Sequence, residues 1–417
     1  MGEQTDGLHG RDGFNLDRAL RPALRGMRGY QPIEPPEQLA ARYGIAAEAI
    51  VKLDGNENPY GPSPRALAAL AALAAQAAQA ALGGSLAAHR YPDPEQRRLR
   101  AALARRHQVP AECIVAGAGA DELIDLVFRV FVEPGDRVVV ASPTFGMYAF
   151  DARISGAELV DVPRDEHDWS LDGEALVEAA STAKVVFIPS PNNPTGGLLP
   201  PELCERLLAS GALLVVDEAY IEFSHGESLA GRAAAGEAPL IVLRTFSKWA
   251  GLAGLRVGYG VMPAAIAATF MQCKQPYGVN VAAEAAALGS LEDGALLDER
   301  ACAIAGERDR LAGLLSAGRW LEPAPSEGNF LLCRLSGRIA DGLASDARAG
   351  DATVSGAALR EALARRGVFV RVFDDPRLRS HVRISVGTTE DSERLLAVLS
   401  EAREELDSLD QPEETAR

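Results

Sequence analysis

The sequence is short of cysteine, histidine and positive charge. Its 417 residues include five cysteines and six histidines, and the cysteines are scattered without a closely spaced pair. This pattern predicts neither a disulfide framework nor a zinc site, so no bound metal is expected, and it favours the reducing cytoplasm. The 42 lysines and arginines are outnumbered by 58 aspartates and glutamates, giving a formal net charge of −16. That balance disfavours nucleic acid as a partner, because sequence-independent binding depends on cations that neutralise phosphates.

Long hydrophobic runs are nearly absent as well. Residues 1–13 are polar and carry both charge signs, so they lack the apolar core of a signal peptide. Residues 66–82 are apolar apart from two glutamines, but alanine is a weak membrane residue and the best helix former. Because Leu67, Leu70 and Leu73 share roughly one face, we expect a packing helix of a water-soluble protein and no membrane partner.

The rest of the chain alternates apolar strands with helix-like stretches. Runs typical of buried strands occupy residues 113–116, 137–140, 158–160, 185–188, 213–216 and 240–243. This alternation predicts an α/β fold in which helices cover both faces of a mainly parallel sheet.

The texture of the sequence changes beyond about residue 289. A helix-like stretch at 297–317 is followed by apolar runs at 330–332, 368–370 and 382–386. We therefore expect a large domain at 51–290 and a smaller α/β domain at 291–417.

Lys248 is the first candidate for chemistry. It follows Thr245 and Ser247, and Arg256 lies eight residues further on. A lysine can form a Schiff base with a carbonyl only if part of it is unprotonated, which requires burial or a nearby positive charge. The two hydroxyls and the guanidinium would suit the phosphate of a cofactor that carries an aldehyde. A lone lysine is more often a solvated surface residue, so this interpretation needs support from other segments.

Two upstream segments give that support. Asn193 lies in a Ser-Pro-Asn-Asn-Pro-Thr-Gly turn after one apolar strand, and Asp217 and Tyr220 follow another. Side chains at the carboxyl ends of such strands face the usual ligand site of an open α/β sheet. An aspartate there can hold a pyridine nitrogen protonated, while the amide and the phenol can donate to a ring oxygen. Each segment alone is also compatible with a helix cap or a simple turn.

The glycine-rich turn at 117–121 adds a phosphate site. It follows the strand at 113–116 and precedes an apolar helix-like run at 123–131. Backbone N–H groups at the start of a helix suit a phosphate, so Gly119, Ala120 and Asp121 are candidate cofactor contacts.

With these segments in order, the chain resembles the fold-type I aminotransferases that use pyridoxal 5'-phosphate, and within them the histidinol-phosphate aminotransferase group. The resemblance extends from about Tyr30 to about Glu405, and it implies that residues 1–50 form an N-terminal arm with part of the small domain. Besides the segments above, it rests on Leu-Asp-Gly-Asn-Glu-Asn-Pro-Tyr-Gly at 53–61, Arg-Tyr-Pro-Asp at 90–93 and Gly-Leu-Ala-Gly-Leu-Arg at 251–256.

The resemblance implies a role for each matching residue. Lys248 would form the Schiff base and move the proton, Asp217 would pair with the pyridine nitrogen, and Asn193 and Tyr220 would meet the ring hydroxyl. Phe145 would stack on the ring. The phosphate would be held by Ala120, Asp121, Thr245, Ser247 and Arg256, together with Tyr60 of the neighbouring subunit in a homodimer.

The expected reaction is transamination between histidinol phosphate and 2-oxoglutarate. The resemblance implies that Arg371 and Arg383 bind the anionic group of each substrate, with Tyr30 and Asn329 as weaker candidates. Two residues depart from the family pattern: Trp249 is larger than the small residue expected there, and Gly278 replaces an asparagine.

Three alternatives remain open. Within the fold they are an aromatic or broad amino-acid aminotransferase and a decarboxylase of a phosphorylated amino acid. From another class, the chain could be the sensing module of a transcription regulator, although the short N-terminal segment leaves no room for a basic helix-turn-helix.

Overall fold

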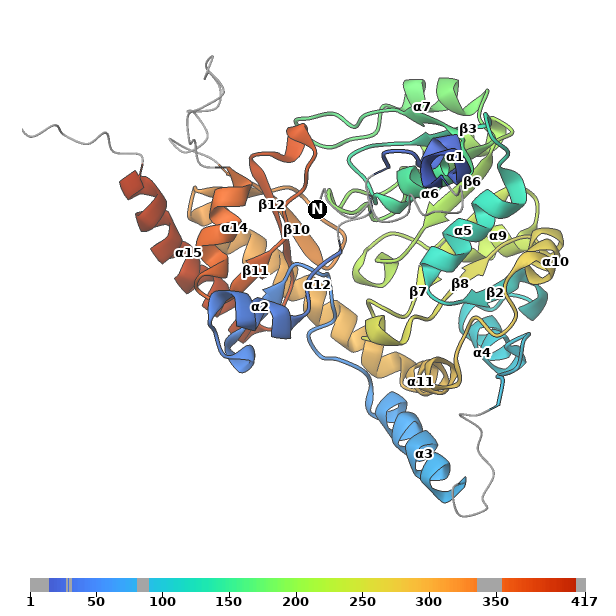
Figure 1. Ribbon diagram of the computed structural model, residues 1–417, viewed down its shortest axis with the longest axis horizontal. Helices are drawn as coiled ribbons and strands as arrows, with labels where there is room; N and C mark the ends of the chain where they lie inside the picture. Colours follow the sequence, from blue (N-terminus) through green and yellow to red (C-terminus); the bar gives the residue numbers. More distant parts are fainter. Residues whose placement is uncertain (1–14, 28, 30–31, 81–89, 336–354, 410–417) are drawn as a thin grey trace, which may run out of the picture.

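A seven-stranded sheet forms the centre of the larger part of the molecule (Figure 1). The computed structural model describes residues 15–27, 29, 32–80, 90–335 and 355–409. The strands of this sheet are β2 (Ile114–Gly117), β3 (Arg137–Val140), β4 (Glu158–Asp161), β5 (Val185–Pro189), β6 (Leu213–Asp217), β7 (Leu240–Thr245) and β8 (Gly258–Val261). They lie in the order β2-β8-β7-β6-β5-β3-β4, and within this sheet only β8 runs antiparallel to its neighbours. The expected α/β class and mainly parallel sheet are confirmed.

Helices cover both faces of the sheet, as Figure 1 shows. The α-helices are α1 (Leu16–Ala19), α2 (Pro36–Tyr43), α3 (Pro64–Ala80), α4 (Arg97–His107), α5 (Ala120–Phe131), α6 (Met147–Ser155), α7 (Gly173–Ala180), α8 (Pro201–Ala209), α9 (Ala230–Ala235), α10 (Ala264–Cys273), α11 (Val281–Glu292), α12 (Gly294–Ala317), α14 (Gly356–Ala364) and α15 (Thr389–Leu409). Short 3-10 turns are η2 (Pro22–Leu24), η3 (Ala47–Ala49), η4 (Ala111–Cys113), η5 (Ile221–Phe223), η6 (Ala253–Leu255) and η7 (Pro376–Leu378).

Alternation along each strand divides the core into two layers. In β6, Leu214 and Val216 pack into the layer beneath α4, α8 and α11, whereas Leu213 and Val215 pack into the layer beneath α5, α6 and α10. All of these β6 residues are buried, so β6 is a continuous apolar run. Such runs are why β2, β3, β5, β6 and β7 could be predicted, whereas β4, which was also predicted, has no fully buried residue.

The smaller part has its own sheets and core. Strands β9 (Leu321–Pro323), β10 (Phe330–Leu335) and β12 (His381–Ser385) form an antiparallel sheet, and β1 (Val51–Leu53) pairs in parallel with β11 (Val368–Val370). Helix α12 joins the two parts, because Leu297 packs in the core of the large sheet and Leu311 in that of the smaller part. Leu53 also packs in the smaller core. The division at residues 50 and 290 stays a prediction.

Helix α3 corresponds to the alanine-rich stretch, and its packing face includes Leu70 of the expected face but not Leu67. Ala66 is fully buried, whereas Leu67 has 52% of its surface exposed, so Leu67 does not face the core. The helix packs against α11, where a Cβ on Gly289 would lie 2.6 Å from the carbonyl oxygen of Arg65. Small side chains therefore determine which face is buried. Among the described residues, no helix is long and apolar enough to cross a membrane.

Candidate active site

A cavity of about 950 Å³ opens at the carboxyl ends of β5, β6 and β7, where the smaller part faces the sheet. Most of the candidate residues line it: Ala120, Asp121, Phe145, Asn193, Asp217, Tyr220, Thr245, Ser247, Lys248, Arg256, Arg371 and Arg383. Gly119, Tyr60 and Asn329 are outside this lining, and Tyr30 lies outside the described residues. The carboxyl end of an open parallel sheet is where the fold leaves room for a ligand.

Lys248 lies in the turn that follows β7. Its Nζ donates a hydrogen bond to the carbonyl oxygen of Gly55 at 3.0 Å and lies 5.9 Å from the centre of the Tyr220 ring. Burial, and next the nearby guanidinium of Arg383, lower the pKa of Lys248 to about 8. The amine is therefore partly unprotonated near neutral pH, as a nucleophile requires.

Hydroxyl groups and a helix N-terminus meet beside Lys248. Thr245 Oγ1 donates to Ser247 Oγ at 3.0 Å and accepts from the backbone N–H of Ser247 at 3.1 Å. Across the cavity α5 begins at Ala120, and no side chain caps this helix end in the described structure. Its first N–H groups therefore remain available to an anion.

Gly119 allows Arg256 to lie against that helix end. The backbone of Gly119 has a φ of +84°, and a Cβ at this position would lie 2.7 Å from Arg256 Nη2. The guanidinium of Arg256 pairs with the carboxylate of Asp121, and both side chains are about half exposed. The Arg256 guanidinium is thus held beside the start of α5.

Asp217 is the last residue of β6 and points toward α6. Its Oδ2 accepts a hydrogen bond from the hydroxyl of Tyr148 at 2.7 Å, and its Oδ1 accepts from the backbone N–H of Ala219 at 3.0 Å. Burial raises the pKa of Asp217 to about 6, and the two hydrogen bonds oppose this rise. Both bonds are to the ionised form, so they favour a carboxylate at neutral pH.

Two arginines lie side by side on the opposite wall. The backbones of Arg371 and Arg383 exchange hydrogen bonds of 3.0 and 2.8 Å, and both guanidinium groups lie within 6.0 Å of the Phe373 ring centre. Arg383 donates to Asn193 Oδ1 at 2.6 Å and also to the carbonyl oxygen of Asp54. Arg371 and Arg383 thus give this side of the cavity a positive charge, in the same cavity as Lys248.

Sequence reasoning missed the roles of Asn56 and Asn192. Asn56 is buried, donates to Tyr220 Oη at 3.2 Å and accepts from Ser385 Oγ at 2.8 Å. Asn192 is also buried and bonds the Pro143 carbonyl and the Thr195 hydroxyl. Both lie inside the motifs at 53–61 and 190–196, but no sequence signal separates a side chain that orients its neighbours from one that lines the cavity.

Asn329 also supports its neighbours from outside the cavity lining. It is fully buried, and its Nδ2 donates to the backbone carbonyl of Asn56 at 3.0 Å. The side chain thus fixes the segment that bonds Tyr220.

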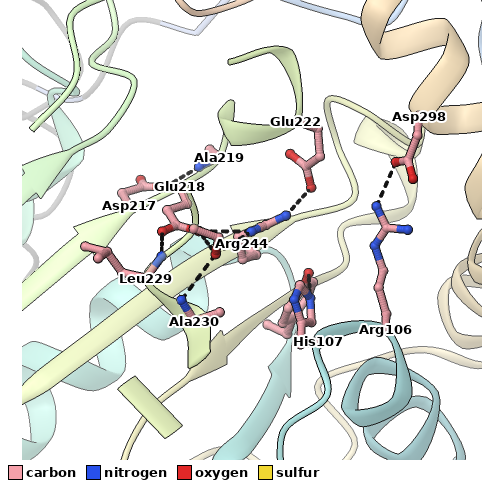
Figure 2. Close-up of polar contacts among 12 residues, drawn as sticks. Arg106, His107, Asp217, Glu218, Ala219, Glu222, Leu229, Ala230, Arg244 and Asp298 are labelled. Atoms are coloured by element: carbon pink, nitrogen blue, oxygen red, sulfur yellow. Dashed lines mark hydrogen bonds and ion pairs between the residues drawn. The ribbon is translucent and has the colours of Figure 1, made fainter. Parts of the chain in front are cut away.

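A buried ion-pair cluster lies behind Asp217 (Figure 2). Arg244 donates to Glu218 Oε2 at 2.9 Å and to Glu222 Oε1 at 2.7 Å, and Glu218 also accepts from Ser228 and from the backbone of Leu229. Burial would lower the pKa of Arg244, but the two carboxylates hold it above its ordinary value. Such a cluster fixes the turn after β6, because losing one charge would strand the others in the core.

The two departures from the expected pattern have local explanations. The Trp249 side chain is 1% exposed, packs beside Phe246 and beneath the Arg106 guanidinium, and is outside the cavity lining. A Cβ on Gly278 would lie 2.8 Å from a carboxylate oxygen of Glu122. The tryptophan is therefore accommodated in the core, and the glycine leaves room for the carboxylate that accepts from the Ala118 N–H.

Among the described residues, no group of three or more His, Cys, Asp or Glu side chains is placed to hold a metal ion. All five cysteines are free.

Comparison with known proteins gives consistent matches. Residues 48–399 match the family model for aminotransferase class I and II. A histidinol-phosphate aminotransferase of Roseiflexus castenholzii is 48% identical over 391 residues, covering 92% of this chain and 97% of that protein. A chloroplastic histidinol-phosphate aminotransferase of Nicotiana plumbaginifolia is 44% identical, covering 92% and 86%. The crystal structure of histidinol-phosphate aminotransferase from Sinorhizobium meliloti in complex with pyridoxal-5'-phosphate superposes with a TM-score of 0.78 at 28% identity, covering 94% and 98%.

Proposed function

Because this chain belongs to the class I and II aminotransferase family, we propose that it transfers the amino group of histidinol phosphate to 2-oxoglutarate. The chain is an enzyme, an aminotransferase that uses pyridoxal 5'-phosphate. The reaction yields imidazole-acetol phosphate and glutamate, a step of histidine biosynthesis. The observation that carries the choice of donor is the pair of adjacent arginines, Arg371 and Arg383, in the cavity that also contains Lys248.

The residues of the cavity fit the cofactor. Three features supply hydrogen-bond donors for a phosphate. They are the Arg256 guanidinium, for which Gly119 leaves space, the uncapped start of α5, and the hydroxyls of Thr245 and Ser247. Asp121 pairs with Arg256 through its carboxylate, so Ala120 and Asp121 contribute backbone N–H groups rather than side chains.

The other end of the cavity fits the ring. Phe145 would supply the stacking face, Asp217 would pair with the ring nitrogen, and Asn193 and Tyr220 would meet the ring hydroxyl. When bound, pyridoxal phosphate supplies an aldehyde that takes up the amino group and a ring that withdraws electrons from the substrate carbon.

Lys248 performs two tasks for this chemistry. With a pKa near 8, its Nζ is unprotonated often enough to attack a carbonyl and to take a proton from the substrate carbon. The same atom returns the proton as a general acid. Asp217 stays ionised near neutral pH, because its pKa is about 6, and its charge favours a protonated ring nitrogen.

The two arginines select the substrates by charge. A phosphate monoester near pH 7 carries about −1.5 to −2 charges and three acceptor oxygens, which two guanidinium groups match well. The same wall accepts the side-chain carboxylate of 2-oxoglutarate, so one cavity serves both half-reactions. Tyr30 and Asn329 assist, Asn329 by supporting the segment around Asn56.

We further propose a homodimer and a cytoplasmic location. Tyr60 is 44% exposed and outside the cavity of its own chain, which is consistent with a contact in the neighbouring subunit's phosphate site. The five free cysteines are consistent with a reducing compartment.

Steady-state comparison of amino donors tests the proposed substrate. We expect histidinol phosphate to give the highest kcat/KM with 2-oxoglutarate, exceeding phenylalanine and tyrosine by up to about ten-thousand-fold, because a donor without phosphate offers no second anion to the two guanidinium groups. Replacing Arg371 by glutamine should raise the KM for histidinol phosphate more than that for phenylalanine. A higher kcat/KM for an aromatic amino acid, or release of carbon dioxide from a phosphorylated amino acid, would refute the proposed donor.

A further inference from the structure

Tyr148 is a fully buried tyrosine in the lining of the cavity, and the chemistry above does not use it. It lies in the first turn of α6. Its ring stacks on Phe187 with centres 4.9 Å apart and meets the edge of Phe145 at 5.6 Å. The aromatic neighbours hold the ring in one orientation. In that orientation the hydroxyl donates to Asp217 Oδ2 at 2.7 Å.

The direction of this hydrogen bond is fixed by chemistry. An ionised carboxylate only accepts, so the phenol must be the donor. Burial, together with the Asp217 charge, raises the pKa of Tyr148 well above its ordinary value, so the phenol keeps its proton throughout the neutral range. The second carboxylate oxygen accepts from the Ala219 backbone. Two donors therefore define the plane and rotation of the Asp217 carboxylate.

We propose that Tyr148 is a positioning residue of the transamination, which orients the carboxylate of Asp217 toward the ring nitrogen and keeps it ionised. The inference rests on the proposed role of Asp217. Tyr148 also contacts Phe145. It therefore positions both Phe145, the proposed stacking partner of the cofactor ring, and Asp217, the proposed partner of the ring nitrogen. A hydrogen bond to the charged form of an acid lowers its pKa, and burial in the sheet acts against it.

Neighbouring negative charges oppose the ionisation of Asp217, and the Tyr148 hydroxyl counteracts them. Asp121, at the start of α5, and Glu218, the next residue in the chain, both repel a negative charge on Asp217. Tyr220 and Asp121 also raise the pKa of Tyr148 through charge repulsion. Among the described residues, the donors that oppose this repulsion are the Tyr148 hydroxyl and the Ala219 N–H, and the hydroxyl can be removed without changing the backbone.

The test uses Tyr148→Phe, which keeps the ring and deletes the hydroxyl. The dissociation constant of pyridoxal phosphate is measured by titrating apoenzyme between pH 5.5 and 8.5, and the visible absorbance of the reconstituted enzyme is recorded over the same range. We expect cofactor binding at pH 7 to weaken about tenfold, as for loss of a hydrogen bond to a charged group. We also expect the acid limb of the binding profile to move up by roughly one pH unit, because more Asp217 is neutral at a given pH.

Tyr43→Phe is the matched control. Tyr43 also donates to a carboxylate, Glu361 Oε2 at 2.9 Å, and also makes an edge contact with a phenylalanine, but it lies in the smaller part of the molecule. It should change neither the dissociation constant nor the pH profile. A loss that is equal at every pH for Tyr148→Phe would indicate lost packing and overturn the proposal.

Two further variants separate this inference from the role of Asp217. In an Asp217→Asn background, Tyr148→Phe should add no further weakening, since the hydroxyl acts through the carboxylate. A silent Asp217→Asn would overturn both ideas, whereas a silent Tyr148→Phe beside an effective Asp217→Asn would overturn the role of Tyr148 alone. If Tyr148→Phe does not fold, a fluorinated tyrosine at position 148, which is a stronger donor, must move the acid limb to lower pH, and an unchanged limb overturns the proposal.

Discussion

At the scale of single residues, the amine of Lys248 shows how burial and charge combine. Loss of water and the Arg383 charge both disfavour the ammonium form, while the carboxylates of Glu57 and Asp121 favour it. The first two effects are larger, and the pKa falls to about 8. An amine in this range is both a nucleophile and a proton carrier at neutral pH.

Replacing Lys248 by alanine should therefore remove the covalent link to the cofactor and lower kcat by about three orders of magnitude or more. Borohydride treatment followed by mass spectrometry measures the link, and the visible absorbance reports it independently. Lys184→Ala, at an exposed lysine beside β5, should leave both unchanged. A Lys248→Ala protein that still gives a borohydride-reducible adduct would show that another lysine carries the cofactor.

The buried carboxyl of Asp151 in α6 should make the stability of the protein depend on pH. It is 8% exposed, and burial, followed by the charges of Asp125 and Asp121, raises its pKa from 3.8 to about 7. The folded state thus prefers the neutral acid. Its contribution to stability is intact below about pH 4, falls as pH rises toward 7, and is lost above that.

Asp151→Asn should accordingly stabilise the protein at pH 8 by about 1–2 kcal/mol and have little effect at pH 4. Urea denaturation at the two pH values measures the difference. Glu178→Gln, at an exposed carboxyl on α7, serves as the control and should change neither value. Equal stabilisation by Asp151→Asn at both pH values would contradict the assigned protonation.

The candidate residues that the sequence predicted share a physical property. Lys248, Asp217 and Asn193 all follow a buried strand, and the ends of parallel strands meet at one edge of the sheet, so short motifs suffice to bring them together. Tyr148 could not be identified in this way, because an aromatic residue near a strand is usually part of the core. Its partner, Asp217, lies 69 residues away in the chain and becomes visible only in the fold.

At the scale of secondary-structure elements, the contact between α3 and α11 depends on Gly289. Alanine is the better helix former by about 1 kcal/mol, so Gly→Ala in an open helix position stabilises. At Gly289, however, a Cβ would lie 2.6–2.8 Å from backbone atoms of Arg65 and Ala66. Overlap with backbone costs about 1–3 kcal/mol, which exceeds the gain in propensity.

Gly289→Ala should therefore destabilise the protein by about 1–2 kcal/mol, whereas Gly306→Ala in α12 should stabilise it by about 0.5–1 kcal/mol. A Cβ on Gly306 has no heavy atom within 4 Å among the described residues outside its own helix, which makes it the matched control. Urea midpoints of the two variants decide the matter. Stabilisation of both would mean that α3 shifts freely on α11.

The elements that the sequence did not predict are those whose residues depend on tertiary contacts. Strand β8 contains Gly258 and Gly260, which weaken any strand pattern. A Cβ on Gly258 would lie 2.6 Å from the backbone nitrogen of Ala120. Glycine at this position therefore lets the start of α5 pack against β8. Leu67 was wrongly placed on the buried face of α3 for a related reason: the closest approach to α11 is at Arg65 and Ala66, where Gly289 leaves no room for a larger side chain.

At the scale of the whole molecule, several large apolar side chains are exposed on the single chain. Tyr60 is 44% exposed, Leu67 52% and Tyr277 39%, and Tyr277 stacks on the 81% exposed Tyr91 at 4.4 Å. Single exposed apolar side chains are common on protein surfaces, so the stacked pair of Tyr91 and Tyr277 is the feature that favours a surface for another protein. The pair supports the proposed homodimer without depending on the chemistry of the cavity.

Complementation between two inactive chains tests whether the dimer shares its sites. Tyr60→Ala and Lys248→Ala chains should each be inactive or nearly so, Tyr60→Ala through weak cofactor binding. A hybrid dimer has one site with an intact Lys248 from one chain and an intact Tyr60 from the other. If subunits mix at random in equal amounts, half of the dimers are hybrids and half of their sites are intact, so about a quarter of wild-type activity should return. Mixing Lys248→Ala with a Tyr60→Ala/Lys248→Ala double variant should restore none. If the first mixture also stays inactive although subunit exchange is demonstrated, Tyr60 acts within its own chain, and a fully active monomer at low concentration would exclude the shared site altogether.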